Sequence, residues 1–371
     1  MIFIQTLSAR FTSRLRSEQV SARLGMWLGI SFTLAFATGL FSHFTQHPPT
    51  WLLWPSRPVN LYRVTQGLHV IGGIATVPLL LAKLWAVYPK LWQWPPLRSA
   101  GHAAERLFVL LLVAGALFQL VTGLMNIAYD YAWPFGFIQA HYWTAFIVYG
   151  ALVVHVVNEW AKLRRHLWTR VQDPDRRRFL YAIAAACGVA ALVTVGETVA
   201  PLDRLAVLAP RNPRIGSQGV PVNRSALAAG ITEAISDPGS YRLVVMGAVR
   251  TPLSLTYADL VRLPQHTVSL PISCVEGWSV ECEWTGIRLR DLIAQAGGSP
   301  EAFLTVESLE QSGYYRSSEV RPPHWNDPLT LLALKINGRT LDADHGYPVR
   351  LIAPNRPGVM QTKWVTRVRV S

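Results

Sequence analysis

Histidines occur inside long apolar stretches in the first half of the chain, where an ionisable side chain is costly and usually functional. His141 and His155 are 14 residues apart, which returns to within about 40° of the same helix face over a rise of about 21 Å. His69 lies in another apolar stretch, at a depth comparable to that of His141. Paired imidazoles from facing helices suit the axial positions of a b-type haem. We therefore expect His69 and His141 to share one haem.

Whether the chain binds a second haem stays open. His155 would need a partner, and His102, before the third apolar stretch, is one choice. His43, at the outer end of the first stretch, is a further candidate haem ligand, although its place beside water equally suits a histidine without iron. The alternative for all these side chains is that each bonds to neighbouring helices.

Two of the three cysteines, Cys274 and Cys282, lie eight residues apart in "LPISCVEGWSVECEW". Outside the cytoplasm a disulfide between them is one interpretation. Another is a thiolate at Cys274 that binds a transition metal in an oxidoreductase. Glu276 either reaches the same centre as a catalytic residue or bonds only nearby backbone. Cys282 and Cys187 are expected to be structural thiols.

A second polar group surrounds Pro357-Gly358 in "PNRPGVMQTKW". Guanidinium, ammonium and glycine backbone together suit a phosphorylated, flat, heteroaromatic ligand. The candidate binding residues are Asn355, Arg356, Lys363 and Trp364.

Five apolar segments must position the histidines. Each is long enough to cross a bilayer as a helix, which takes about 20 residues. They run over 24–42, 63–87, 107–128, 138–160 and 179–199. Half of the 371 residues are hydrophobic and 15% are charged, which is rare in a soluble protein. The formal charge of +13 is spread around the apolar segments, so it favours a membrane over nucleic acid.

The distribution of arginine and lysine predicts the topology. Basic residues gather before the first segment, between the second and third, and after the fourth, which places the N-terminus in the cytoplasm and the C-terminal part outside it. The fifth segment begins with "RRRFL", at Arg176 to Arg178, which resembles a twin-arginine export signal. An ordinary positively charged anchor is the alternative.

The rest of the chain has the mixed composition of a globular α+β domain. An extended lead-in over 201–240 precedes strand-like runs, and Asn337-Gly338 is a hairpin signal. The runs are "YRLVVMGAV", "FLTVESL", "LTLLALKINGRTL", "YPVRLIAP" and "KWVTRVRV". A short amphipathic helix is expected in "GIRLRDLIAQAGG". The predicted division is therefore 1–170 for four membrane helices, 171–200 for a fifth, and 201–371 for an outer domain.

Residues 20–165 resemble the cytochrome b561-type membrane domains, in which two histidines 14 apart on the fourth helix pair with histidines of the first and second helices. The resemblance implies haem b and electron exchange with quinone or quinol. One feature departs from the family pattern. Where the family has an inner ligand on helix 1, this chain has Leu24, Gly25 and Met26.

Residues 215–371 resemble the molybdopterin-binding domain of the sulfite oxidase superfamily. The resemblance implies that Cys274 ligates molybdenum and that the pterin dithiolene supplies two more sulfurs. It also implies that Asn223 and Arg224, the "PNRPGVMQTKW" loop and His345 hold the pterin and its phosphate. The "CVEGW" form is more similar to the periplasmic protein-methionine-sulfoxide reductases, because the sulfite oxidases carry an Asn-Arg pair after the cysteine.

Together these features predict an all-α membrane bundle of five helices followed by an α+β molybdopterin domain, in the cell membrane. The expected activity is that of an oxidoreductase in which quinol, haem and molybdenum reduce an S- or N-oxide outside the cytoplasm. One alternative is a dehydrogenase that oxidises sulfite or another small molecule and reduces quinone. Another is a non-catalytic haem relay whose outer domain docks a partner. The expected partners are membrane lipid, quinone or quinol, the substrate and the twin-arginine export machinery, and no nucleic acid.

Overall fold

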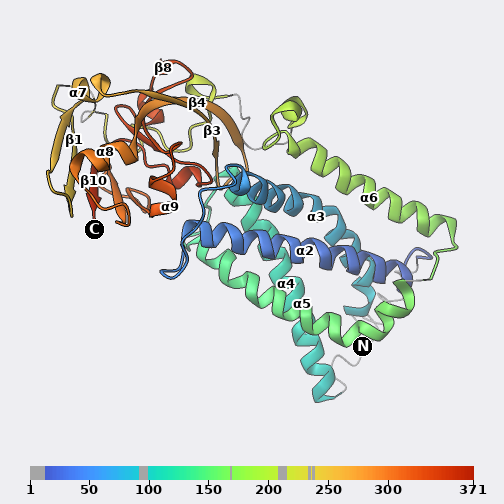
Figure 1. The fold of residues 1–371 in the computed structure, drawn as a ribbon. Coiled ribbons are helices and arrows are strands. Elements are labelled where there is room, and N and C mark those ends of the chain that lie inside the picture. The colour runs from blue at the N-terminus through green and yellow to red at the C-terminus, as the bar shows by residue number, and fades with distance from the viewer. Residues whose placement is uncertain (1–12, 92–98, 168, 208–214, 233–234, 236–238) are drawn as a thin grey trace. The chain divides into compact units, whose positions relative to one another are not determined.

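The computed structural model describes residues 13–91, 99–167, 169–207, 215–232, 235 and 239–371 (Figure 1). The chain divides into two compact units. Unit 1 comprises Met1–Leu40, Leu68–Val195 and Leu205–Pro210, and unit 2 comprises Phe41–Gly67, Gly196–Arg204 and Arg211–Ser371. This division differs from the one drawn from the sequence. Residues 41–67 join the sheet-containing unit, because their side chains and carbonyls hydrogen-bond within it.

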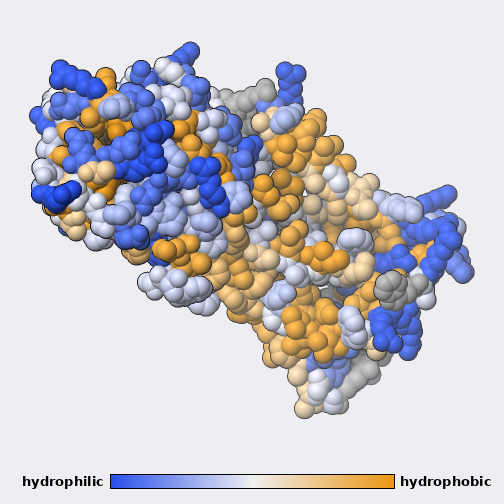
Figure 2. Space-filling view, viewed as in Figure 1, coloured by the Kyte–Doolittle hydropathy of each residue, from blue (hydrophilic) through white to orange (hydrophobic). Residues whose placement is uncertain are grey.

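Unit 1 is built from long helices (Figure 1). They are α2 (Glu18–Gln46), α3 (Leu61–Leu91), α4 (Ala100–Ala128), α5 (Phe137–Leu167) and α6 (Pro174–Val195), of which α2 and α3 extend into unit 2. Five helices within the described residues are long and apolar enough to cross a membrane by length and composition. Hydrophobic side chains cover much of their visible surface in Figure 2. The prediction of five long apolar helices is therefore confirmed.

The ends and contacts of α4 follow from particular residues. The Ser99 hydroxyl caps the first turn by accepting a hydrogen bond from the backbone N–H of His102. Tyr129 adopts the left-handed conformation and its N–H closes the last turn. At Gly115 a Cβ atom would lie 2.4 Å from Val148 Cγ2 on α5, so the absence of a side chain allows the two helices to approach closely.

Unit 2 contains two five-stranded sheets. The first has the order β2-β1-β10-β5-β6, with β1 parallel to β10 and the other neighbours antiparallel. Its strands are β1 (Arg242–Gly247), β2 (Leu253–Thr256), β5 (Leu304–Ser308), β6 (Ser317–Val320) and β10 (Val365–Val370). The second has the order β3-β4-β7-β8, and β9 also pairs with β7. Its strands are β3 (His266–Ser273), β4 (Ser279–Arg288), β7 (Leu331–Ile336), β8 (Arg339–Thr340) and β9 (Arg350–Ile352).

Short helices complete unit 2. The α-helices are α7 (Tyr257–Arg262), α8 (Leu289–Ala296) and α9 (Pro322–Trp325). The 3₁₀ turns are η1 (Ala200–Leu205), η2 (Ser217–Gly219), η3 (Ala343–His345) and η4 (Gly358–Met360). Helix α8 lies in the predicted amphipathic segment and ends at Gly297, whose φ of 72° favours glycine. It begins later than expected, because Gly286 and its neighbours continue β4 and pair with β7.

Each strand-like run identified in the sequence contains an observed strand, and Asn337-Gly338 turns β7 into β8. Strands β2, β3, β4 and β6 were not predicted. The expected lead-in over 201–240 is partly outside the described residues, and its described part contains η1 and η2. A sheet-containing domain therefore follows the helices, as the sequence indicates.

Candidate functional site

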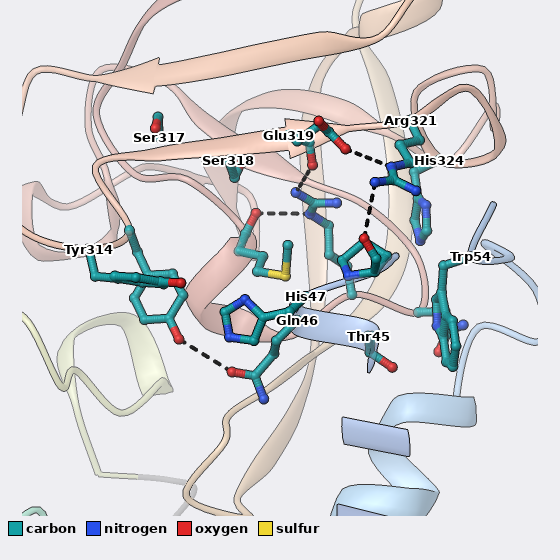
Figure 3. Close-up of a pocket in the computed structure, with 15 residues that line it drawn as sticks. Thr45, Gln46, His47, Trp54, Tyr314, Ser317, Ser318, Glu319, Arg321 and His324 are labelled. Atoms are coloured by element: carbon teal, nitrogen blue, oxygen red, sulfur yellow. Dashed lines mark hydrogen bonds and ion pairs between the residues drawn. The ribbon is translucent and has the colours of Figure 1, made fainter. Parts of the chain in front are cut away.

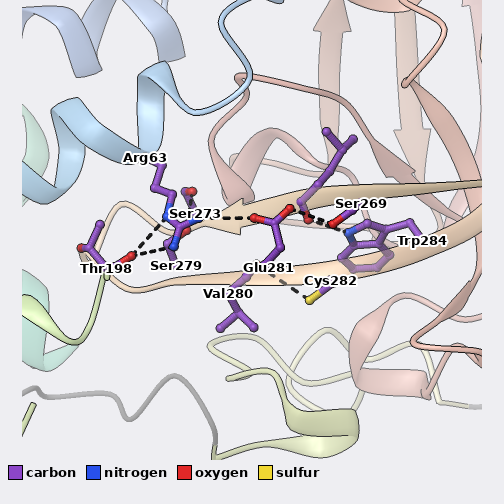
Figure 4. Close-up of polar contacts among 10 residues, drawn as sticks. Arg63, Thr198, Ser269, Ser273, Ser279, Val280, Glu281, Cys282 and Trp284 are labelled. Atoms are coloured by element: carbon purple, nitrogen blue, oxygen red, sulfur yellow. Dashed lines mark hydrogen bonds and ion pairs between the residues drawn. The ribbon is translucent and has the colours of Figure 1, made fainter. Parts of the chain in front are cut away.

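Cys274 lies in the loop that joins β3 to β4. The loop is closed by two backbone hydrogen bonds, from Cys274 N to Trp278 O at 2.9 Å and from Gly277 N to Cys274 O at 3.2 Å. Gly277 has a φ of 106°, which favours glycine. The Ser273 and Ser279 hydroxyls join the strand ends at 2.8 Å (Figure 4). The hairpin therefore fixes the Cys274 thiol in a buried position, with 2% of the residue exposed.

Cys282 points to a different part of the hairpin. It pairs with Leu270 across the sheet, four positions before Cys274, which corresponds to about 13 Å along a strand. A disulfide requires Cα atoms less than about 7 Å apart. None of the three cysteines, all within the described residues, forms a disulfide. The disulfide alternative is therefore wrong, and burial raises the pKa of the Cys282 thiol to about 12, as expected for a structural thiol.

Cys282→Ala is expected to lower the melting midpoint of the purified protein by about 4 °C or less, because a small buried group is lost. Molybdenum content and turnover should stay at wild-type levels. Thermal melting, elemental analysis and a turnover assay measure these three quantities. A loss of bound molybdenum in this variant would contradict the structural role.

Three of the predicted cofactor-binding residues lie near Cys274. The Asn223 amide nitrogen is 3.4 Å from the Cys274 sulfur. Lys363 Nζ donates to the backbone oxygens of Arg224, at 2.8 Å, and of Asp344, at 2.7 Å. It also acts electrostatically on the Cys274 thiol. The structure thus gathers Cys274, Asn223, Arg224 and Lys363 from segments far apart in the sequence.

The charges around this cluster fit an anionic cofactor. Burial and the neighbouring Arg350 lower the pKa of Lys363 to about 7, and burial lowers the pKa of Arg350 to about 10. The Nε atoms of Arg224 and Arg350 are buried and have no hydrogen-bond partner among the described residues. His345 is also buried, and its Nε2 donates to the backbone oxygen of Ser217. A phosphorylated ligand would satisfy these donors and restore the charged state of Lys363.

Three other predicted binding residues use their side chains within the protein. Asn355 accepts from Tyr62 N and donates to Pro55 O, both at 2.8 Å. Arg356 donates to the backbone oxygens of Met360 and Glu319, at 2.9 and 2.6 Å. Trp364 belongs to a buried hydrophobic cluster, and its Nε1 donates to Ala343 O at 2.7 Å. Their contact with a pterin stays a prediction.

Glu276 lies beside a buried carboxyl that the sequence did not reveal. Glu276 is 1% exposed and its Oε2 accepts from Trp278 Nε1 at 2.9 Å. Glu197 is also 1% exposed, and neither carboxyl oxygen has a hydrogen-bond partner among the described residues. Its backbone oxygen accepts from Ser279 N at 2.9 Å. Burial and the Glu276 charge raise the pKa of Glu197 to about 8.

Glu197→Gln should stabilise the protein in a pH-dependent way. The unfolded chain releases the Glu197 proton near pH 4.5, whereas the folded chain keeps it until about pH 8. Stability therefore falls as the pH rises between these values. The variant should raise the melting midpoint by about 2 °C or more at pH 8, and leave it unchanged at pH 4.5. Glu281→Gln is the control, because Glu281 is exposed and lies on the β3–β4 hairpin, whose Ser279 contacts Glu197. An equal gain in this variant would contradict the explanation.

Residues from the start of α3 also hold the hairpin. Arg63 donates to Thr198 O at 3.1 and 2.8 Å and pairs with Glu281 at 3.3 Å (Figure 4). Gln66 Nε2 donates to Val275 O, next to Cys274, at 2.6 Å. Polar residues in the first turns of an apolar helix are the signal that could have revealed this contact. The Cys274 loop is therefore supported by unit 2 residues on both sides of the predicted domain boundary.

In unit 1, His69 of α3 and His141 of α5 face each other with ring centroids 6.2 Å apart. Two metal–nitrogen bonds of about 2 Å, with about 1 Å from each nitrogen to its ring centre, give about 6 Å. His69 Nδ1 lies 2.9 Å from Ala35 O, which can only accept. His141 Nδ1 lies 2.9 Å from Thr122 Oγ1, whose proton goes to Phe118 O. Both Nδ1 atoms therefore donate, which leaves the Nε2 lone pairs for a metal.

The other candidate haem ligands lie elsewhere. Among the described residues no ring contact joins His155 to His102, and the charged groups that act on His155 include Lys83. Lys83 Nζ donates to the oxygens of Ser21 at 2.8 Å, and a Cβ on Gly25 would lie 3.1 Å from it. The ammonium group of Lys83 thus lies near the position where the cytochrome b561-type domains are expected to have the helix-1 ligand of the inner haem. His43 lies in unit 2, with its ring 5.0 Å from that of His47.

Comparisons with known proteins concern the C-terminal part of the chain. Residues 229–371 match the family model described as the oxidoreductase molybdopterin binding domain. The chain is 34% identical over 161 residues to mitochondrial sulfite oxidase of Rattus norvegicus, covering 36% of this chain and 30% of that protein. It is 33% identical over 148 residues to the protein-methionine-sulfoxide reductase catalytic subunit MsrP of Gluconobacter oxydans, covering 36% and 47%.

Among solved structures, the sulfane dehydrogenase SoxCD from Paracoccus pantotrophus matches with 30% identity and a TM-score of 0.34, over 36% of this chain and 39% of that one. The chain thus spans less than half the length of the sulfite oxidase and MsrP that it matches. The matched region contains Cys274, Lys363 and Arg350 but not the long helices. Residues 229–371 therefore match a molybdopterin-binding domain of oxidoreductases, and the C-terminal part of the chain is similar to the sulfite oxidases and to MsrP.

Proposed function

We propose that the chain is a membrane-bound molybdenum oxidoreductase that takes electrons from quinol through one b-type haem and reduces a small S- or N-oxide outside the cytoplasm. The observation that carries this proposal is the pair His69–His141 at 6.2 Å, in the same chain as a molybdopterin-binding domain. A haem supplies single-electron transfer and a molybdenum–pterin group supplies two-electron oxygen-atom transfer when bound.

The residues around Cys274 have distinct roles in this proposal. Cys274 binds the metal, and Asn223 donates a hydrogen bond to its sulfur. Arg224 and Arg350, whose buried Nε atoms have no partner among the described residues, bind the phosphorylated end of the pterin together with Lys363. Burial of the loop excludes water from the metal ligand.

The proposed topology follows from charge and composition. Arginines and lysines flank the cytoplasmic ends of the five long apolar helices. The N-terminus is then cytoplasmic, unit 2 lies outside the cytoplasm, and Arg176 to Arg178 address the chain to the twin-arginine machinery.

The direction of the reaction is supported by the residues after Cys274. Glu276 is directed to the indole of Trp278 and gives this loop an acidic side chain instead of the Asn-Arg pair expected in sulfite oxidases. An anion such as sulfite would meet like charge there if Glu276 is ionised. A neutral oxide would not.

Reoxidation of the haem tests this function. Protein reduced by a quinol analogue should show a reduced haem b spectrum that persists under argon and is reoxidised when an S- or N-oxide is added. Cys274→Ser should accept electrons from quinol but should not be reoxidised. If no oxide in a broad panel reoxidises the wild-type haem, the reductase proposal is wrong.

The reverse direction is the second candidate, favoured by the 34% identity to a sulfite oxidase. In that case sulfite should reduce the haem of the oxidised protein without quinol. The same optical measurement therefore separates the two directions.

A further inference from the structure

A cavity of about 350 Å³ lies within unit 2 (Figure 3). One wall comes from the end of α2 and the residues after it, and the other from the segments around β6, α9 and η4. The first wall is Thr45, Gln46, His47, Pro48 and Trp54, and the second includes Tyr314, Tyr315, Glu319, Arg321, His324 and Met360. Its volume is in the range of small-molecule sites.

The first wall is fixed in place by hydrogen bonds. Arg321 donates to the backbone oxygens of Pro48, Pro49 and Leu52 at 2.8 to 3.1 Å. Asp327 accepts from Arg57 Nε and from the Ser56 hydroxyl, both at 2.9 Å. An arginine and an aspartate thus hold both ends of the stretch 48–57, from which Pro48 and Trp54 line the cavity.

The two arginines that line the cavity already donate to groups within the protein. The Arg321 guanidinium is occupied by the three backbone oxygens and Glu319, and Arg356 by two backbone oxygens. Burial lowers the pKa of His47, so its imidazole is neutral at pH 7. Trp54 Nε1 is buried and has no hydrogen-bond partner among the described residues.

The cavity adjoins the Cys274 loop. Asn355 and Arg356 line the cavity and directly precede Pro357, which forms a β-bridge with Ser273, the residue before Cys274. At the cavity wall, the Tyr315 hydroxyl donates to Gln46 Oε1 at 3.3 Å, and Gln46 Nε2 donates to the Ser42 hydroxyl at 3.1 Å.

We propose that this cavity binds the substrate as a small, uncharged, dipolar oxide, and that the stretch between α2 and α3 determines its specificity. Trp54 and His47 donate to the oxide oxygen, and Gln46 positions the Tyr315 hydroxyl. This inference rests on the proposed function, and it adds the substrate class and residues outside the part that matches the molybdopterin family. A neutral acceptor suits the N–H of Trp54, because a buried donor costs free energy when it stays unsatisfied.

Two substitutions test the inference in the full-length protein loaded with cofactors. Trp54→Phe removes the indole N–H but keeps an aromatic ring, and His47→Leu removes the imidazole. With dimethyl sulfoxide as substrate each should raise KM by about tenfold, and change kcat less. Haem reduction by quinol and molybdenum content should stay at wild-type levels. Trp51→Phe is the matched control, because Trp51 belongs to the same stretch, is 80% exposed and does not line the cavity.

Binding of dimethyl sulfone, which resembles the substrate but is not reduced, provides a readout independent of turnover. Titration calorimetry should show saturable binding to the wild type and at least about tenfold weaker binding to Trp54→Phe. Unchanged KM and unchanged sulfone binding in both variants would overturn the inference while leaving the reductase function intact. If wild type reduces no oxide, the proposed function fails. Sulfone binding lost in Trp54→Phe would then still support a site for dipolar oxides, and no binding to wild type would overturn it.

Discussion

Cys274→Ser is expected to reduce oxide turnover by at least about 100-fold, since losing only an outer partner of a metal site already costs about 10- to 100-fold. A serine hydroxyl stays protonated where a cysteine thiol ionises, so it is a poor ligand for a soft metal site. The buried hairpin loop should accept the nearly isosteric change, because its closure depends on backbone hydrogen bonds. Turnover is measured by haem reoxidation, and molybdenum by elemental analysis.

The haem spectrum and the reduction of haem by quinol serve as the internal control for this variant, because His69 and His141 lie in unit 1. Cys282→Ala is the control for loss of a cysteine. Turnover of Cys274→Ser near the wild-type rate would show that Cys274 is not the metal ligand.

His69→Ala and His141→Ala are each expected to abolish the haem b absorption of the purified protein. Each change removes one of two imidazoles, on α3 and α5, whose ring centroids lie 6.2 Å apart and whose Nδ1 atoms are both used in hydrogen bonds. A haem with one remaining protein ligand binds weakly and is lost during purification. Absorption spectra and haem extraction, normalised to protein, measure the loss, and quinol should no longer support reduction of the oxide.

The control is His166→Ala, which changes a histidine in the last turn of the same helix α5 that pairs with Glu18. It should keep one haem per chain. His155→Ala addresses the second haem, since a drop from two haems to one would contradict the single-haem assignment. An unchanged spectrum in His69→Ala would contradict the pairing itself.

The sequence predicted those features that depend on local periodicity and on residue chemistry. Five apolar runs became five long helices, because length and hydrophobicity alone specify them. The approach of His69 to His141 was expected from comparable depth on two helices, and the rings lie 6.2 Å apart. Cys274 was identified by its neighbours, and the hairpin explains why Cys282 cannot bridge to it.

What the sequence did not predict depends on contacts between distant segments. Strands β3 and β4 contain proline, cysteine and acidic residues, so apolar and polar residues do not alternate clearly along them, and the sequence pattern did not reveal them. Glu197 has no motif around it, and its significance comes from burial beside Glu276. Asn355 was expected to bind a ligand, but its amide is occupied by Tyr62 and Pro55, and no rule of spacing reveals such a partner.

The stretch from Phe41 to Gly67 has a consequence for the order of biogenesis. It belongs to unit 2, yet it is made long before the residues that it contacts there, such as Arg321, Asp327 and Asn355. On the proposed topology this stretch inserts early and faces outward, whereas a domain carried by the twin-arginine route folds around its cofactor first. The ion pair between Arg57 and Asp327 then forms after transport. Cofactor loading in the cytoplasm would therefore precede closure of the cavity, and the precursor would carry its metal without a finished substrate pocket until it reached the other side.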